Sequence, residues 1–215
     1  MLLLLIFTAC SKMDTPYKDF IEGGKINYAA KADSVRVGAG RERIGMRWLL
    51  MSDPKINKAV IYWNGRQDSH VVAIERKNAI DTISIVIPQM PEGTYVFDIY
   101  TFDYNGNASI KVPVLGNIYG STYEAGLLPR PVRSKVLKAD TLRLQWYDAA
   151  AGVIGVETQY TDADGIARRF IIPKDTVEGK LPGVKAGGEV KLRTLFLPEA
   201  GAIDTFYTPF LKLNF

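Results

Sequence analysis

The chain has 215 residues, of which 47% are hydrophobic, 11% aromatic and 23% charged, and its formal net charge is +4. This composition excludes a disordered chain, which would be poorer in aromatic and β-branched residues, and the length allows one or two domains. Basic residues are scattered among acidic ones, which argues against nucleic acid as a partner. One histidine, His70, and one cysteine, Cys10, are too few for a structural zinc site or an internal disulfide.

The N-terminal segment, residues 1–9, is an apolar run that ends in small residues directly before Cys10. Such a run is typical of a secretory signal peptide, and it is too short to span a bilayer, which needs about 20 apolar residues. The tetrapeptide Phe7-Thr8-Ala9-Cys10 resembles a bacterial lipobox. The resemblance implies cleavage before Cys10, lipid attachment at that cysteine and anchoring of the exported chain in a membrane of the cell envelope. The alternative is a buried N-terminal strand that holds an ordinary core cysteine.

Residues 10–18 are polar and contain one proline, which predicts a short tether between the lipid and the first domain. Surface-exported lipoproteins of Bacteroidetes often carry acidic residues just after the cysteine, and Asp14 is the one acidic residue of this tether. We therefore expect the outer membrane as the location, and both the periplasmic and the surface leaflet stay open.

The second half of the sequence repeats characteristic residues of the first half in the same order. Trp48 and Tyr62 are 14 residues apart, as are Trp146 and Tyr160. Further matching positions are Ile74 with Ile172, Asp81-Thr82 with Asp175-Thr176, Pro88 with Pro182, and Gly93 with Gly188. Repeated marks over about 50 residues indicate two copies of one structural unit.

Each copy has the pattern of β-strands. Residues 43–50 and 141–146 alternate apolar and polar side chains, which is the period of a half-buried strand. Residues 59–63 are rich in β-branched and aromatic residues, as strands are, and residues 84–87 and 95–102 continue the series. Turn signals separate the segments at positions 64–65, 91–93, 105–106 and 164–165. Short strands at regular spacing, without a sustained helical period, predict an all-β sandwich fold.

Residues 90–95 read Met-Pro-Glu-Gly-Thr-Tyr and precede an alternating run that ends in an Asn-Gly-Asn turn. This arrangement resembles a fibronectin type III domain, in which Trp48 stands at the position of the core tryptophan and Tyr95 at that of the corner tyrosine. The second copy keeps its tryptophan at Trp146 and has Val190 at the tyrosine position. The resemblance implies two tandem fibronectin type III/immunoglobulin-like β-sandwiches.

Glycine and proline residues interrupt the strand pattern between Gly116 and Pro131. We therefore expect the first sandwich over residues 19–117, a linker over residues 118–131 and the second sandwich over residues 132–215. Large apolar side chains predict that the linker packs between the two domains: Tyr119, Tyr123, Leu127 and Leu128.

Four segments resemble a family of Bacteroidetes lipoproteins of unknown function: residues 17–28, 52–55, 59–63 and 116–120. That family is associated with polysaccharide-use loci and their accessory surface lipoproteins. The resemblance implies an accessory protein of the cell envelope, and it brings no catalytic residues to this chain.

Recognisable catalytic motifs are missing from the sequence. His70 has no nucleophile motif around it, and we interpret it as part of a hairpin edge. Paired carboxylates could hydrolyse a glycoside, but Asp98 and Asp103 are better interpreted as surface residues beside a turn. Residues 103–107 and 162–165 resemble calcium loops but lack the downstream glutamate, which favours a turn-forming role. We therefore expect no enzymatic activity, no cofactor and no metal site.

Strand alternation yields one candidate site. The alignment of the two copies predicts that Val60 and Tyr62 face the core, because successive side chains of a strand point to opposite faces. The neighbouring residues would then form an outward apolar cluster, which is the candidate ligand or partner surface: Ile61, Trp63, Tyr100 and Phe102. Such a cluster typically marks an interaction surface. The alternatives are that the second domain or the linker aromatics cover the cluster, or that the opposite strand register buries it.

These observations lead to two hypotheses of function. The first is a lipid-anchored binding module of the cell envelope that holds a polysaccharide or docks on a nutrient-uptake complex. The second is a structural spacer or assembly lipoprotein that contacts only other envelope proteins. An exposed aromatic platform would favour the first hypothesis, and a dry interface between the domains that uses the same aromatics would favour the second.

Overall fold

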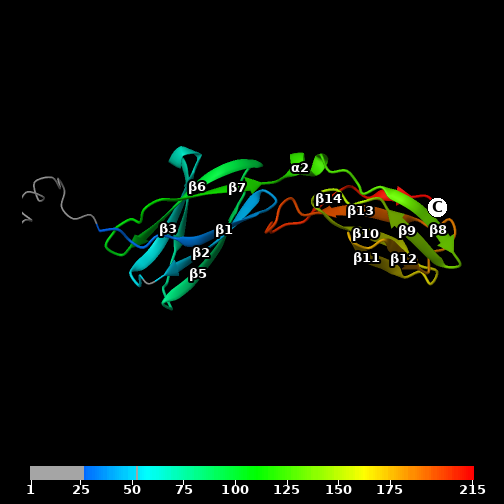
Figure 1. The fold of residues 1–215 in the computed structure, drawn as a ribbon, viewed down its shortest axis with the longest axis horizontal. Coiled ribbons are helices and arrows are strands. Elements are labelled where there is room, and N and C mark those ends of the chain that lie inside the picture. The colour runs from blue at the N-terminus through cyan, green and yellow to red at the C-terminus, as the bar shows by residue number, and fades with distance from the viewer. Residues whose placement is uncertain (1–26, 52) are drawn as a thin grey trace, which may run out of the picture.

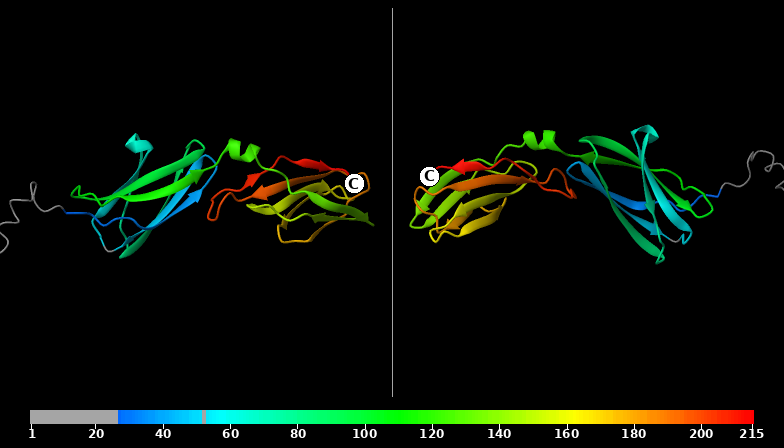
Figure 2. Two further views of the ribbon diagram at one scale, coloured as in Figure 1. Left: turned by 45° about the horizontal axis from the view of Figure 1, so that its top comes forward. Right: turned by 180° about the vertical axis from the view of Figure 1, so that it is seen from behind.

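The computed structural model describes residues 27–51 and 53–215, which form two antiparallel β-sandwiches one after the other (Figure 1). Figure 2 shows from two further sides that the second sandwich continues the long axis of the first. This all-β architecture confirms the predicted fold class. The expected signal peptide (1–9), the expected tether (10–18) and Cys10 lie outside the described residues.

The first sandwich packs a three-stranded sheet against a four-stranded sheet. The three-stranded sheet has the order β1-β2-β5 and the four-stranded sheet the order β4-β3-β6-β7. The strands are β1 (Asp33–Ala39), β2 (Arg43–Met51), β3 (Ile56–Trp63), β4 (Asp68–Ala73), β5 (Ile80–Pro88), β6 (Gly93–Asp103) and β7 (Val112–Ile118). Three strands on one sheet and four on the other give the sandwich the fibronectin type III-like arrangement that the sequence predicted.

The core of the first sandwich forms around Trp48, whose side chain is fully buried. The side chains of β2 alternate, so that Ile44 and Met46 lie in the same core as this tryptophan. The corner tyrosine is also present, because the hydroxyl of Tyr95 donates a 3.0 Å hydrogen bond to the carbonyl oxygen of Pro91. This bond ties the start of β6 to the turn before it.

The second sandwich repeats the plan of two packed antiparallel sheets. Its sheets have the orders β12-β9-β8 and β11-β10-β13-β14, and β15 also pairs with β13. The strands are β8 (Val132–Lys138), β9 (Thr141–Trp146), β10 (Val153–Thr161), β11 (Ala167–Pro173), β12 (Glu178–Pro182), β13 (Val190–Phe196), β14 (Phe206–Tyr207) and β15 (Leu211–Leu213). Trp146, Tyr160 and Val190 all lie in its core, so a buried valine occupies the place of the corner tyrosine.

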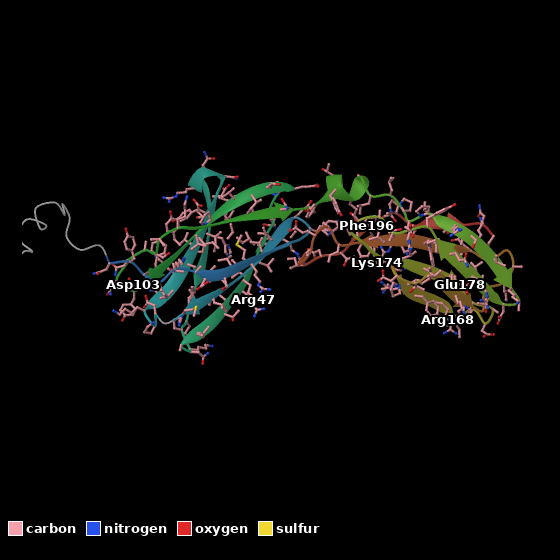
Figure 3. All side chains as sticks on the ribbon, viewed as in Figure 1. Arg47, Asp103, Arg168, Lys174, Glu178 and Phe196 are labelled. Carbon is pink, nitrogen blue, oxygen red and sulfur yellow. The ribbon has the colours of Figure 1, made fainter. Side chains whose placement is uncertain are left out.

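The two segments that resemble calcium loops are turns closed by their first aspartate. One side-chain oxygen of Asp103 accepts the backbone N–H groups of Asn105 and Asn107 at 2.9 and 2.8 Å. Asp162 accepts the backbone N–H of Ile166 at 2.9 Å in the same way. The interpretation of these segments as turns is therefore confirmed. Figure 3 shows Asp103 at the end of the first sandwich that is distant from the second.

The linker contains a short helix, α2 (Ser121–Ala125), which the sequence did not predict because five residues are too few to show a helical period. The first N–H groups of a helix have no partner inside it. Here the carboxylate of Glu92 accepts the N–H groups of Thr122 and Tyr123 at 2.9 and 2.7 Å. The first sandwich therefore fixes the start of this helix.

The expected packing of the linker is confirmed for three of its four large apolar residues. Tyr119, Tyr123 and Leu127 pack against a cluster that the second sandwich contributes, which contains Phe196 and Phe206. Figure 3 shows Phe196 at the end of the second sandwich that faces the first. The prediction is wrong for the fourth residue of the set, since Leu128 is 79% exposed.

Candidate functional site

The outward surface of the four-stranded sheet is the candidate functional site. Residues that lie directly opposite each other on antiparallel strands share a face of the sheet. Tyr100 of β6 lies opposite Val60 of β3, and Phe102 lies opposite Lys58. Ile99 is fully buried in the core. Tyr100 and Phe102 therefore point away from the core, and each is half-buried by its neighbours.

The predicted orientation of Ile61 and Trp63 is wrong. Ile61 is fully buried, and Trp63 packs against the core beside Phe97, with ring centroids 6.0 Å apart. The outward aromatic residue of β3 is Tyr62 instead. The alignment of the two copies matched Tyr62 to Tyr160, which does point into the core of the second sandwich. A shift of one residue between the copies exchanges the two faces of a strand, and this shift reversed the assignment for β3.

Tyr62, Tyr100, Phe102, Lys58 and Arg66 form a cluster that we call the aromatic face. The two tyrosines meet edge to face, with ring centroids 6.0 Å apart and an angle of 79° between the rings. The guanidinium carbon of Arg66 lies 5.1 Å from the centre of the Tyr100 ring and 5.7 Å from that of Tyr62. The ammonium of Lys58 lies 4.9 Å from the centre of the Phe102 ring. Both cations are within the range of a cation–π interaction, so the face is aromatic and positively charged at once.

A left-handed turn places Arg66 on these rings. The short 3₁₀ segment η1 (Asn64–Arg66) joins β3 to β4, and φ is 51° at Asn64, 64° at Gly65 and 70° at Arg66. Such values are costly for residues other than glycine and persist where the surroundings compensate for them. Here the side-chain amide of Asn64 donates a 2.6 Å hydrogen bond to Asp68, and Arg66 donates one to the hydroxyl of Tyr100. The sequence marked Asn64-Gly65 as a turn, but no sequence pattern indicated where the following arginine would point.

Exposed aliphatic side chains border the aromatic face. Val71 of β4 lies opposite Val60, and Leu115 of β7 lies opposite Val96 of β6. Val71, Val96 and Leu115 are each about three-fifths exposed, at 61%, 59% and 64%. A border of this kind enlarges the apolar area that a bound molecule could cover.

The second sandwich does not lie over the aromatic face. In Figure 1 it continues beyond the ends of β6 and β7 and leaves their sheet uncovered. The linker aromatics pack against each other and against the second sandwich instead. The ring centroids of Tyr119 and Tyr123 are 4.6 Å apart, and the ring of Tyr123 meets that of Phe206 edge to face. The alternative that the second domain or the linker covers Tyr100 and Phe102 is therefore excluded for the described residues.

The joint between the sandwiches is the second feature of defined geometry, and ion pairs hold it. The guanidinium of Arg41 donates two hydrogen bonds to Glu124 of α2, at 2.6 and 2.8 Å. Arg43 at the start of β2 donates two to Asp204 of the second sandwich, at 2.8 and 2.5 Å. The bond from Arg41 lowers the pKa of Glu124, and the bond from Arg43 lowers the pKa of Asp204. Both carboxylates therefore stay charged at neutral pH.

Close backbone contacts complete the joint. The N–H of Ile203 donates a 2.7 Å hydrogen bond to the carbonyl oxygen of Ala39. A methyl group added at Gly38 would lie only 2.8 Å from the carbonyl oxygen of Gly201. The end of β1 and the loop before β14 thus approach each other as closely as the backbone allows.

We expect the substitution Gly38→Ala to loosen the joint while both sandwiches stay folded. The new methyl group overlaps a backbone oxygen that cannot rotate away, and accommodating such an overlap typically costs about 1–3 kcal/mol. Backbone amide NMR relaxation should show one common rotational correlation time in the original chain and two shorter, separate ones in the variant.

Gly126→Ala is the matched control, because its methyl group would make an ordinary contact of 3.5 Å with the carbonyl oxygen of Tyr123. Its relaxation should match that of the original chain. Unchanged tumbling in Gly38→Ala would show that this contact does not hold the sandwiches together.

The remaining sequence candidates occupy structural positions. His70 lies on β4, the edge strand of its sheet, as the sequence indicated. Asp98 forms an ion pair with Lys111 at 3.6 Å, and the carboxylate of Asp103 accepts backbone hydrogen bonds within its own turn. Within residues 27–51 and 53–215, no group of three or more His, Cys, Asp or Glu residues could hold a metal ion. No helix of that part of the chain is long and apolar enough to cross a membrane.

A comparison with known families covers nearly the whole chain. The DUF4998 family, which is described as a domain of unknown function, matches residues 10–206. The chain belongs to this family. The DUF4998 match includes the first sandwich, the joint and the second sandwich as far as Phe206. No curated protein matches the chain.

Two of the solved structures that match this chain consist of fibronectin type III domains. The FN1–FN3 domains of chicken CNTN1 are 17% identical, and the match covers 88% of this chain and 66% of that chain, with a TM-score of 0.45. This chain therefore spans just under two thirds of the length of that structure. A segment of two fibronectin type III domains from chicken tenascin is 10% identical, and its match covers 85% of this chain and 99% of that chain, with a TM-score of 0.34. These likenesses concern the fold.

Proposed function

We propose that this chain is a lipid-anchored binding module of the cell envelope, without catalytic activity, that holds a glycan on its aromatic face. The lipid would be attached at Cys10 and would place the chain at the outer membrane. The observation that supports binding is the outward cluster of Tyr62, Tyr100 and Phe102, which neither the second sandwich nor the linker covers. A contiguous outward cluster of large apolar side chains typically marks an interaction surface.

The charges on the aromatic face favour a glycan over a dry protein interface. Lys58 lies directly on the ring of Phe102, and Arg66 lies on the two tyrosine rings. Lysine is depleted from the core of protein–protein interfaces, whereas arginine and aromatic residues are enriched there, so Lys58 carries this distinction. A sugar presents apolar ring faces and hydroxyl groups side by side. Rings and hydrogen-bond donors placed next to each other match that alternation.

Affinity electrophoresis of the purified chain through gels that contain single polysaccharides tests this proposal. One glycan of a broad panel should slow the original chain, and Tyr100→Ala should weaken that binding about tenfold through the loss of one ring contact. Tyr104→Ala removes a tyrosine that is 65% exposed in the turn after β6, and it should leave the binding unchanged. Trp63 is unsuitable for this test because it packs against the core.

The two ways in which this test can fail have different meanings. Retardation that survives in Tyr100→Ala would move the binding site away from the aromatic face. A chain that no glycan slows would overturn glycan binding altogether.

The joint favours a second candidate function, a structural spacer or assembly lipoprotein that contacts only other envelope proteins. Its ion pairs and backbone contacts hold the sandwiches in line, which suits a chain that must keep a partner at a fixed distance from the membrane. In that case the exposed Val71, Val96 and Leu115 would lie in a protein interface. Loss of glycan binding from the whole panel would make this candidate the better one.

A further inference from the structure

Arg66 differs from most arginines of this chain in its electrostatic partners. Seven arginines of the described residues form ion pairs with carboxylates: Arg41, Arg43, Arg76, Arg143, Arg168, Arg169 and Arg193. None of the ion pairs among residues 27–51 and 53–215 includes Arg66 or Lys58. The aromatic face therefore presents two cations whose charge no acidic side chain of the described chain balances.

The guanidinium of Arg66 also has hydrogen-bonding capacity left over. An arginine carries five N–H donors in a planar fork. One bond to the hydroxyl of Tyr100 is the only hydrogen bond that the Arg66 side chain makes within the described residues. The remaining donors suit an oxygen acid, because a carboxylate or sulfate group can accept two parallel N–H bonds from one guanidinium. The turn of η1 and the two tyrosine rings hold this fork in place before a ligand arrives.

The one acidic side chain on the outward face of β6 is already neutralised. Asp98 lies opposite Tyr62, and its carboxylate pairs with Lys111 at 3.6 Å. An anionic group that approaches Arg66 therefore meets Lys58 and Arg66 as unbalanced positive charges on the rings. Opposite charge at this site favours an anionic ligand over a neutral one.

A second basic hollow, in the other sandwich, is less suited to an anion. It has a volume of about 460 Å³ and is lined by Arg168, Arg169, Lys185 and Lys191, among other residues. Arg168 is bound to Asp162, Arg169 to Glu157, and Lys191 to Glu189. Ion pairs with carboxylates of the protein thus neutralise three of these four basic side chains, whereas Lys58 and Arg66 of the aromatic face form no such ion pair within the described residues.

We propose that the ligand of the aromatic face is an acidic glycan, whose carboxylate or sulfate group pairs with Arg66 while a sugar ring contacts the tyrosines. This inference rests on the proposed glycan-binding function and adds the chemical class of the ligand. Arg66 is a binding residue in this arrangement, and its stacking on Tyr100 continues when the anion is bound.

Binding of matched polysaccharide pairs to the purified chain tests the inference. Polygalacturonate and its carboxyl-reduced form differ only in the carboxylate, and chondroitin sulfate and its desulfated form differ only in the sulfate. In one pair, the member that carries the acid group under test should bind, and its carboxyl-reduced or desulfated counterpart should bind at least about tenfold more weakly, as expected for the loss of a charge-assisted hydrogen-bonded pair. The pair that responds identifies which acid the site takes.

Two arginine variants separate a specific contact from general attraction by a basic protein. Arg66→Ala should bind the acidic polymer at least about tenfold more weakly than the original chain. Arg66→Lys should restore only part of that affinity, since lysine cannot form the two parallel bonds. Arg47→Ala removes the same charge from the three-stranded sheet on the other side of the sandwich, where Figure 3 labels it, and should change binding less than twofold.

The outcomes distinguish this inference from the function on which it rests. Binding of neutral glycans that Tyr100→Ala abolishes and Arg66→Ala does not would overturn the acidic ligand and leave the glycan-binding function standing. Equal losses in Arg66→Ala and Arg47→Ala would also overturn it, because the attraction would then be non-specific. A chain that binds neither acidic nor neutral polymers would overturn both.

Discussion

Replacing Trp48 with alanine is expected to lower the free energy of unfolding of the first sandwich by about 3–5 kcal/mol. The indole is fully buried between the two sheets, where it belongs to the same core as Ile44, Phe97 and Ile99. Its removal takes away the largest apolar contact of that core and leaves a cavity that strands held in two sheets cannot close. Because a domain of this size has a total stability of about 5–15 kcal/mol, the loss would bring the first sandwich close to unfolding.

Urea denaturation followed by tryptophan fluorescence measures this loss. Trp63 reports on the first sandwich and Trp146 on the second, so the variant should show an early transition for the first and an unchanged one for the second. Trp48→Phe is the matched control, because it keeps an aromatic ring and removes the indole N–H, which is buried without a hydrogen-bond partner. We expect it to cost less than half as much as alanine. Equal stability of Trp48→Ala and the original chain would show that the two sheets do not depend on this side chain.

Replacing Glu157 with glutamine is expected to destabilise the second sandwich by roughly 3 kcal/mol at pH 7. Glu157 lies on β10 and is fully buried, and its carboxylate accepts hydrogen bonds from Arg169, Arg193 and Gln159 at distances between 2.7 and 3.3 Å. Burial raises the pKa of Glu157, but the bonds from the two arginines and from Gln159 outweigh burial and lower the pKa from 4.5 to about 2. Glutamine keeps the shape of the side chain and removes the charge that these bonds require.

The lowered pKa also predicts how this stabilisation depends on pH. A carboxylate whose pKa is lower in the folded chain than in the unfolded chain stabilises the fold fully above the unfolded pKa, near 4.5. The stabilisation disappears as the pH falls toward the folded pKa of about 2, because the folded state must then also take up the proton. The difference in stability between the original chain and Glu157→Gln should therefore be largest above pH 4.5 and shrink to near zero at about pH 2.

Thermal or urea unfolding at a series of pH values between about 2 and 7 measures this difference. Glu75→Gln changes an exposed glutamate of the first sandwich and serves as the matched control, whose unfolding should follow that of the original chain throughout. A constant difference between Glu157→Gln and the original chain at all pH values would contradict the prediction, since a lost packing contact would not depend on the proton.

Five of the strands (β2, β3, β5, β6 and β9), the turns at Asx-Gly pairs and the two core tryptophans could be predicted from the sequence because local signals determine them. Alternation over five to eight residues marks the buried row of β2 with Trp48, and Asx-Gly pairs mark turns where backbone conformation is restricted. The resemblance to a fibronectin type III domain placed Tyr95, near the start of β6, at the position of the corner tyrosine, and its bonding partner Pro91 is only four residues away. These elements need no knowledge of what lies across the sandwich.

Only the tertiary structure decided which face of β3 is outward and where the two sandwiches meet. Ile61 and Tyr62 are both large and apolar, so the pattern of β3 alone allows either register, and the pairing of Val60 with Tyr100 selects one. Arg66 reaches the tyrosine rings because three consecutive residues adopt left-handed φ values, which its sequence neighbours permit but do not require. The joint depends on pairs that are far apart in the chain, since Arg41 and Glu124 are separated by 83 positions. Local sequence patterns do not predict such distant partners, because these residues come together only through the packing of both sandwiches.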